Sequence, residues 1–209
     1  MAAYFHICLA LAGRRCLVVG GGKVAARKAA SLARAGAHVS VVSPAFCPEF
    51  SELDGVELLE RHFQDGDPDG ATLVVAATDD EELNRQIARA AQKHGALVNV
   101  VDAPDLCDFF VPASVVRGDL VVGISTSGKA PALAKRLRVE LEDLLPPGYA
   151  EFVELLGELR SEVMAGVRDG SRRAEVFHEL ASRRTWELFT AEGPEAVRAL
   201  ARRLIAASR

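Results

Sequence analysis

The chain has 209 residues, of which 49% are hydrophobic and 26% charged, so it has enough apolar residues for a folded core. One domain, or one domain with an appendage, accounts for this length. The formal net charge is only −4 and no block of like charges occurs, which argues against a sequence-blind nucleic-acid binder. No apolar run is long enough for a bilayer, and the first residues lack the basic start of a signal peptide. We therefore expect a cytoplasmic protein with no membrane partner.

The cysteines and histidines are scattered along the chain. None of the 4 cysteines forms a C-x-x-C pair, and the 5 histidines show no ligand spacing. A built-in metal centre is therefore not expected, although an iron ion handled in transit would not need one.

Up to Asp105 the chain alternates strand-like and helix-like segments. Apolar runs at residues 16–19, 38–42, 56–59, 73–77 and 97–101 predict strands. Helical patterns cover residues 24–35 and 79–94, and each stops at a glycine. Strands separated by helices of this length imply right-handed crossovers and a buried parallel sheet. The predicted class is α/β, with a Rossmann-like parallel sheet.

After Asp105 the rhythm changes. Residues 113–116 and 120–124 flank Arg117-Gly118-Asp119 and predict a hairpin, followed by a helix over residues 131–145. The Pro-Pro-Gly sequence at 146–148 marks a boundary. These observations predict three parts: a nucleotide-binding domain over 1–112, a small α+β dimerisation segment over 113–147, and an all-α C-terminal tail over 148–209.

Only helical patterns follow this boundary. Apolar residues from Phe152 to Val167 recur at the spacing of an amphipathic helix, and further helices are predicted over residues 173–190 and 194–207. A monomer with this pattern would expose the apolar strip at 152–167, so we expect a homodimer.

A glycine-rich turn joins the first predicted strand to the first helix. Gly20, Gly22 and Ala25 satisfy G-x-G-x-x-[GA]. Gly20 would make the tight turn, Gly22 would leave room for a pyrophosphate, and Ala25 would let the helix pack closely on the strand. Lys23 and Val24 open the helix, whose free N–H groups favour an anion. The pattern predicts dinucleotide binding, against the alternative of a turn that merely reverses the chain.

The end of the second predicted strand lacks the acidic residue that usually holds the adenosine ribose. Ser43 could make a weaker contact there, which favours NAD over NADP. Lys23 and Arg27 lie near a possible 2′-phosphate in sequence, so NADP stays open.

Polar residues follow the fourth and fifth predicted strands, where ligands bind in open α/β sheets. Thr78 and Glu81 fit a capping box, yet Thr78 and Asp79 are equally placed for cofactor contact. Asp102 could form an Asx-turn before Pro104. At the same position its carboxylate could accept a proton while a hydride leaves to the cofactor.

Five ordered blocks carry a family resemblance. They are residues 18–28, residues 76–80 with Leu83 and Asn84, residues 99–104, residues 109–113 with 117–120, and residues 124–134. Together they resemble the precorrin-2 dehydrogenase / sirohydrochlorin ferrochelatase family, which includes the N-terminal region of siroheme synthase. The resemblance implies NAD-dependent oxidation of precorrin-2 to sirohydrochlorin by a homodimer, and in some members insertion of Fe2+. It also assigns to Asp102 the role of the family's key carboxylate.

The substrate implied by this resemblance carries many carboxylates, which need cations and helix N-termini. Ser125, Thr126, Ser127 and Lys129 precede the helix at residue 131 and are expected to bind it, together with Asn99. One departure is Ala130, where siroheme synthase has Ser. Arg136 and Arg138 stand four residues before Glu140 and Glu142, a spacing that favours a solvated helix face.

Two other functions remain compatible with the sequence. One is a non-catalytic NAD-binding sensor or scaffold dimer. The other is a chelatase only, which would act without NAD and would tolerate a bulky residue at position 22.

Overall fold

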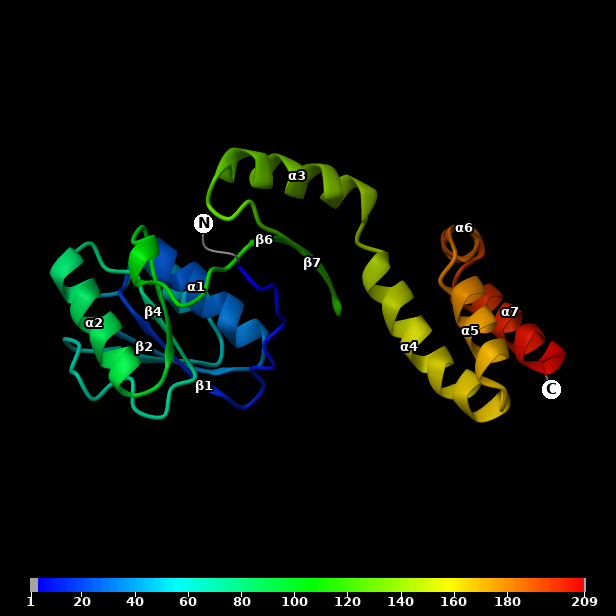
Figure 1. Ribbon diagram of the computed structural model, residues 1–209, viewed down its shortest axis with the longest axis horizontal. Helices are drawn as coiled ribbons and strands as arrows, with labels where there is room; N and C mark the ends of the chain where they lie inside the picture. Colours follow the sequence, from blue (N-terminus) through cyan, green and yellow to red (C-terminus); the bar gives the residue numbers. More distant parts are fainter. Residues whose placement is uncertain (1–3, 209) are drawn as a thin grey trace. The chain divides into compact units, whose positions relative to one another are not determined.

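The computed structural model describes residues 4–208, which form two compact units (Figure 1). The first unit is Tyr4–Val111, and the second comprises residues 112–208. Each unit has a hydrophobic core of its own.

A five-stranded parallel sheet organises the first unit. Its strands are β1 (Arg15–Val19), β2 (His38–Ser43), β3 (Val56–Glu60), β4 (Leu73–Ala76) and β5 (Leu97–Val100). They lie in the order β3-β2-β1-β4-β5, and every pair is parallel. The order reverses at β1, so the crevice between β1 and β4 is where a doubly wound sheet binds its ligand. The Rossmann-like class is confirmed, and each expected strand differs from the observed one by one residue at one end.

The two helices of this unit cover opposite faces of the sheet (Figure 1). Cys16 and Val18 share one core with α1 (Lys23–Arg34), whereas Leu17 and Val19 share another with α2 (Glu81–Lys93). Successive strand side chains point to opposite faces, which is why an unbroken apolar run suits a strand buried on both sides. Two short 3-10 helices, η1 (Pro48–Glu52) and η2 (Pro104–Leu106), follow β2 and β5.

The second unit begins with the expected hairpin. The strands β6 (Ala113–Arg117) and β7 (Leu120–Ile124) pair antiparallel, and α3 (Pro131–Leu144) packs on them. The Arg117 guanidinium fastens this arrangement, because Nε donates to the Leu145 carbonyl at 2.6 Å and Nη2 to the Glu142 carbonyl at 3.3 Å.

Four helices complete the second unit: α4 (Tyr149–Gly166), α5 (Gly170–Leu180), α6 (Arg183–Glu192) and α7 (Pro194–Ala207). The sequence pattern over 173–190 does not continue as one helix. It breaks at Ser182, whose hydroxyl accepts a hydrogen bond from the Thr185 amide at 3.2 Å and so caps α6.

The apolar strip at 152–167 is not exposed, so the first reason for expecting a dimer was wrong. Phe152, Leu159, Val163 and Val167 are each at most 4% exposed. They pack against α5, α6 and α7 of the same chain, with Phe152 beside Trp186. The helices of one chain supply the partner that the strip needs.

Within residues 4–208, no helix combines the length and the apolarity needed to cross a membrane. The three-part division at 112 and 147 stays a prediction.

Candidate functional site

The glycine turn after β1 is packed between two other segments at the carboxyl edge of the sheet. Gly20 has φ +129°, and a Cβ there would overlap the Ala77 carbonyl just after β4. A Cβ on Gly21 would overlap the carbonyl oxygen of Ala45, which follows β2. Only glycine fits at these two positions, so the segments after β1, β2 and β4 meet in one rigid arrangement.

Gly22 differs from its two neighbours because a Cβ there would meet nothing within 4 Å. It is the N-cap of α1 in extended conformation, and no side chain caps that helix. The first N–H groups of a helix lack intrahelical partners. Ala25, one turn on, is fully buried and lets α1 pack closely on the sheet. Open space before uncapped helix N–H groups fits a dinucleotide pyrophosphate.

The other helix that starts at this edge is less suited to an anion. The carboxylate of Asp80 caps α2 by accepting from the Glu82 and Leu83 amides at 2.9 and 3.0 Å. Glu81 and Glu82 add negative charge to its first turn, whereas α1 has no acidic residue there. The two helix N-termini therefore differ, and α1 is the one suited to phosphate.

Of the two roles weighed for Thr78, the cap of α2 is not the one found, because the cap is Asp80. The Thr78 hydroxyl donates to Asn84 Oδ1 at 2.8 Å, and Asn84 Nδ2 donates to the Thr78 carbonyl at 2.9 Å. Asn84 is buried, so this pair ties the segment after β4 to the second turn of α2. Asp79 is exposed beside this pair at the same edge.

Two other expected cofactor ligands are engaged with protein partners. Ser43 is 8% exposed, and its hydroxyl donates to the Ala45 carbonyl at 2.7 Å, which closes a local turn. The ammonium group of Lys23 lies 2.8 Å from Glu49 Oε1. Ser43 shapes the turn that packs on Gly21, and Lys23 is held over the loop that follows β2.

Asp102 stands at the same edge, just beyond β5. The Val101 amide continues the sheet by donating to the Ala76 carbonyl at 2.9 Å, and Asp102 then adopts φ +59°. Its carboxylate is exposed and makes no hydrogen bond or ion pair with the described residues, so the Asx-turn alternative is not what the structure contains. Left-handed backbone at a non-glycine residue is uncommon and is found disproportionately at functional sites.

The loop after Asp102 is pinned to the sheet. Asn99 is 7% exposed, and its Nδ2 donates to the Phe109 carbonyl at 2.9 Å. The Cys107 thiol donates to the Val100 carbonyl at 3.2 Å. Asn99 therefore holds the backbone that presents Asp102, and the strained residue lies on a fixed turn.

The expected anion loop lies in the second unit, before α3. Ser127 and Gly128 have φ +53° and +76°, and the Lys129 amide donates to the Thr126 carbonyl at 3.0 Å. The hydroxyl of Ser125 accepts from the Ser127 amide, and that of Thr126 accepts from the Ala130 amide, each at 3.1 Å. The loop is a tight turn stabilised by its own hydroxyls, and no side chain caps α3. The structure thus places Ser125 to Lys129 at an open helix N-terminus.

The Arg136 and Arg138 side chains pair with Glu140 and Glu142 along α3, as their spacing predicts.

Sequence reasoning missed Glu49. It lies six residues beyond Ser43 in the chain, outside the strand end where an acidic residue was sought. In the structure η1 brings it back to Lys23 at the start of α1. The spacing of about 20 residues that usually separates the glycine motif from the acidic residue ends near Ser43, so it does not reach Glu49.

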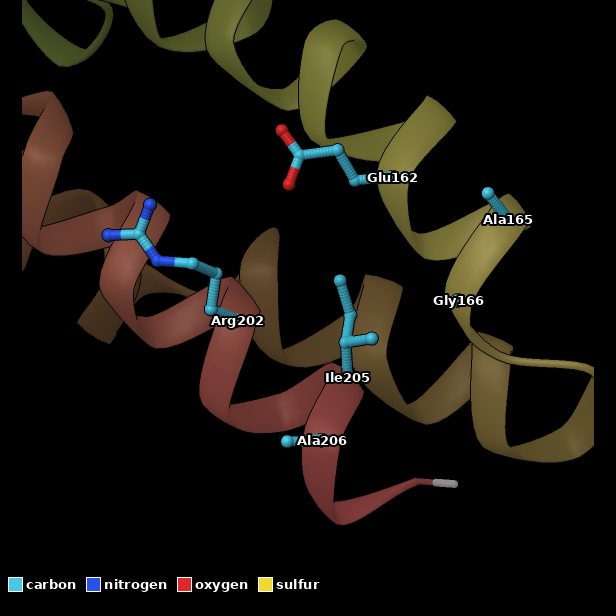
Figure 2. Close-up of a pocket in the computed structure, with 6 residues that line it drawn as sticks. All are labelled: Glu162, Ala165, Gly166, Arg202, Ile205 and Ala206. Atoms are coloured by element: carbon cyan, nitrogen blue, oxygen red, sulfur yellow. The ribbon is translucent and has the colours of Figure 1, made fainter.

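A hollow of about 470 Å³ lies in the second unit between α4 and α7 (Figure 2). Glu162, Gly166, Arg202 and Ile205 are among its lining residues. No residue expected to bind cofactor or substrate lines it. In the part of the chain that is described, no cluster of three or more His, Cys, Asp or Glu side chains could hold a metal ion.

Two family models match adjoining parts of the chain. Residues 7–113 match a family described as putative NAD(P)-binding, and residues 117–144 match one described as the central region of sirohaem biosynthesis proteins. The first match covers the whole glycine-turn edge and the second covers the loop before α3. The first match confirms a nicotinamide dinucleotide as the cofactor, in agreement with the expected NAD.

Curated relatives extend the similarity to nearly the full chain. A siroheme synthase from Thioalkalivibrio sulfidiphilus is 41% identical over 198 residues, which are 93% of this chain and 40% of the relative. One from Pseudomonas paraeruginosa is 45% identical over 204 residues, which are 96% of this chain and 43% of the relative. The chain thus spans less than half the length of these relatives.

A solved structure gives a match over nearly all of this chain and the whole of the other. The protein SirC, described as a precorrin-2 dehydrogenase, has a TM-score of 0.78 and 25% identity, with 96% of this chain and 100% of that chain covered. The five sequence blocks all lie within the residues that the two family models match. The chain therefore belongs to the siroheme-biosynthesis family of NAD(P)-binding proteins.

Proposed function

We propose that this protein is an NAD-dependent precorrin-2 dehydrogenase that oxidises precorrin-2 to sirohydrochlorin. The observation that carries the proposal is the placement of Asp102 on a strained, pinned turn at the same sheet edge as the glycine turn. Likeness to SirC over 96% of this chain and 100% of that chain supports the same activity.

The spacing of the sheet suits this chemistry. Asp102 follows β5, which lies two strands from β1 and its glycine turn. Two strand spacings amount to about 10 Å, a span that a dinucleotide extending from its pyrophosphate to its nicotinamide can cover. The exposed Asp102 carboxylate is therefore available to a substrate lying against the nicotinamide.

The reaction removes a hydride and a proton from precorrin-2. NAD+ bound at Gly20, Gly22, Lys23, Val24 and Ala25 would supply the hydride acceptor. Asp102 accepts the proton as general base, so that no charge accumulates on the macrocycle. Thr78 and Asn99 hold the backbone around this edge, while Asp79 and Ser43 complete the cofactor's surroundings.

The acidic side chains of the substrate need a separate anchor. We place it at the turn formed by Ser125, Thr126, Ser127 and Lys129, because the uncapped start of α3 offers N–H groups to a carboxylate. The assignment is supported by the helix start that follows this turn, which no side chain caps.

We further propose that the protein acts as a homodimer through the hairpin. Val116 and Val121 are paired across β6 and β7 and are 53% and 56% exposed. A two-stranded sheet is marginally stable alone, and α3 also carries exposed apolar residues at Leu133 and Leu144. A second copy of the chain bound to this surface would bury the valines of the hairpin and the exposed leucines of α3.

Insertion of Fe2+ into sirohydrochlorin, a lyase activity, is a second candidate. An iron ion would be a substrate here, and Asp102 could also take up the pyrrole N–H protons released during insertion. A cytoplasmic location stays a prediction.

The test is an assay of the purified chain with precorrin-2, in the presence and absence of NAD+. We expect NADH and sirohydrochlorin to form together, and neither to form without NAD+. Binding of NAD+ without any NADH would support a sensor or scaffold instead. Iron-dependent siroheme formation from sirohydrochlorin, with no NADH from precorrin-2, would identify a chelatase only.

A further inference from the structure

The end of β2 leaves the adenosine ribose of a bound dinucleotide without its usual acidic partner. Ser43 cannot replace that residue in its observed position, because its hydroxyl is buried and donates to the Ala45 carbonyl. A dinucleotide whose pyrophosphate lies at Gly22 still extends its adenosine toward the loop that follows β2. A carboxylate supplied from further along this loop would satisfy the same requirement.

The loop after β2 is fixed against the glycine turn. The Cys47 amide donates to the Gly21 carbonyl at 2.8 Å, and the Ala45 carbonyl leaves no room for a side chain on Gly21. The 3-10 helix η1 starts immediately afterwards at Pro48. Glu49, in its first turn, is therefore held close to the start of α1.

The Glu49 carboxylate has one oxygen in use and one without a partner. Its Oε1 lies 2.8 Å from the Lys23 ammonium group. Its Oε2 is shielded from solvent and, within the described chain, lacks a hydrogen-bond partner of standard geometry, although 40% of the side chain is exposed. A shielded carboxylate oxygen without a donor is unfavourable, so a ligand hydroxyl that supplied one would be stabilised.

The carboxyl group stays ionised at neutral pH. Lys23 first, and then the Glu49 main-chain N–H and the nearby Cys47 thiol, lower the pKa of Glu49 from 4.5 to about 2. The ion pair itself is weak, because the Lys23 side chain is 82% exposed and solvent screens it. A change of the Glu49 side-chain rotamer, opposed only by this weak ion pair, can therefore turn Oε2 out of its shielded position toward a ligand.

We propose that Glu49 accepts a hydrogen bond from the adenosine ribose of the bound dinucleotide and so selects NAD over NADP. The inference rests on the dinucleotide binding of the proposed function. A 2′-phosphate in place of the 2′-hydroxyl would offer no donor and would meet a negative charge. Glu49 also neutralises Lys23, which with Arg27 would otherwise attract that phosphate.

The test compares the Glu49→Gln and Glu52→Gln variants of the full chain. Glu52 lies on the same 3-10 helix and is exposed, so its substitution removes the same charge at a matched position. Dissociation constants for NAD+ and for NADP+ are measured by calorimetry without substrate. Thermal unfolding of both variants checks that the fold is unchanged.

In Glu49→Gln we expect NAD+ to bind about tenfold more weakly and NADP+ about tenfold more tightly, so the preference falls about a hundredfold. Glu49→Asp, which keeps the charge on a shorter side chain, should shift the preference in the same direction by less. An unchanged NAD+ to NADP+ ratio in Glu49→Gln, or an equal shift in Glu52→Gln, would overturn the inference and leave the proposed function standing. If the unsubstituted protein binds neither dinucleotide, both fail together.

Discussion

The loops that lead into α1 and α3 both end at a helix start with no side-chain cap, and they are built differently. The turn at Gly20 to Gly22 is held by its surroundings, since carbonyl groups after β2 and β4 occupy the space of two missing side chains. The turn at Ser125 to Lys129 is held by its own hydroxyl groups, and a Cβ on Gly128 would meet nothing within 4 Å. The first loop is a rigid cradle suited to one invariant group, the pyrophosphate. The second is held from within and has open space at Gly128, where we propose that the carboxylates of the substrate bind.

The largest difference between the two loops should appear on adding one methyl group. Gly21→Ala is expected to lower the free energy of unfolding by about 3 kcal/mol, because the Ala45 main chain has to move. Gly128→Ala should cost only about 1 kcal/mol, since its φ of +76° disfavours a side chain but the space is open. Urea denaturation of both variants measures this. Equal losses would contradict the distinction between a packed and an open turn.

A large side chain at Gly22 should weaken NAD+ binding without lowering the stability of the fold. Gly22→Leu is expected to weaken NAD+ binding about a hundredfold, because the side chain enters the space left for the pyrophosphate. The unfolding midpoint should stay close to that of the unsubstituted protein. Gly66→Leu is the matched control, since Gly66 also lies in open space and has no positive φ. Retention of NAD+ affinity in Gly22→Leu would place the cofactor elsewhere.

The smallest expected effect concerns the second loop. Thr126→Val removes the hydroxyl that accepts from the Ala130 amide and should raise the KM for precorrin-2 about threefold, with NAD+ affinity unchanged. Thr190→Val, which removes an exposed hydroxyl from α6, serves as its control. A change in NAD+ affinity without a change in KM would contradict the assignment of this loop to substrate.

The sequence predicts the sheet well because its strands are short apolar runs between clear helix stops. The glycine spacing likewise locates the turn, because the motif from Gly20 to Ala25 lies within six consecutive residues, although the group that excludes a side chain at Gly20 is the distant Ala77 carbonyl. Both features depend on residues close together in the chain, which is where pattern reasoning is strongest.

The features that the sequence did not predict depend on tertiary contacts. Thr78 fits a capping box, but its hydroxyl donates a hydrogen bond to Asn84, and Asp80 is the residue that caps α2. Glu49 lies outside the expected strand end, and only the folding of η1 brings it to Lys23. The apolar strip on α4 predicts an external partner, whereas α5, α6 and α7 bury it within one chain.

The role of Asp102 is best tested by a single turnover of precorrin-2 by the Asp102→Asn variant at saturating NAD+. Asparagine keeps the size of the side chain and tolerates left-handed backbone, so the turn at φ +59° should persist. We predict that NADH formation slows by about 10²- to 10⁴-fold while the dissociation constant for NAD+ is unchanged. NADH formation at the unsubstituted rate would contradict the role of Asp102 as proton acceptor and, with it, the placement of the reaction at this edge of the sheet.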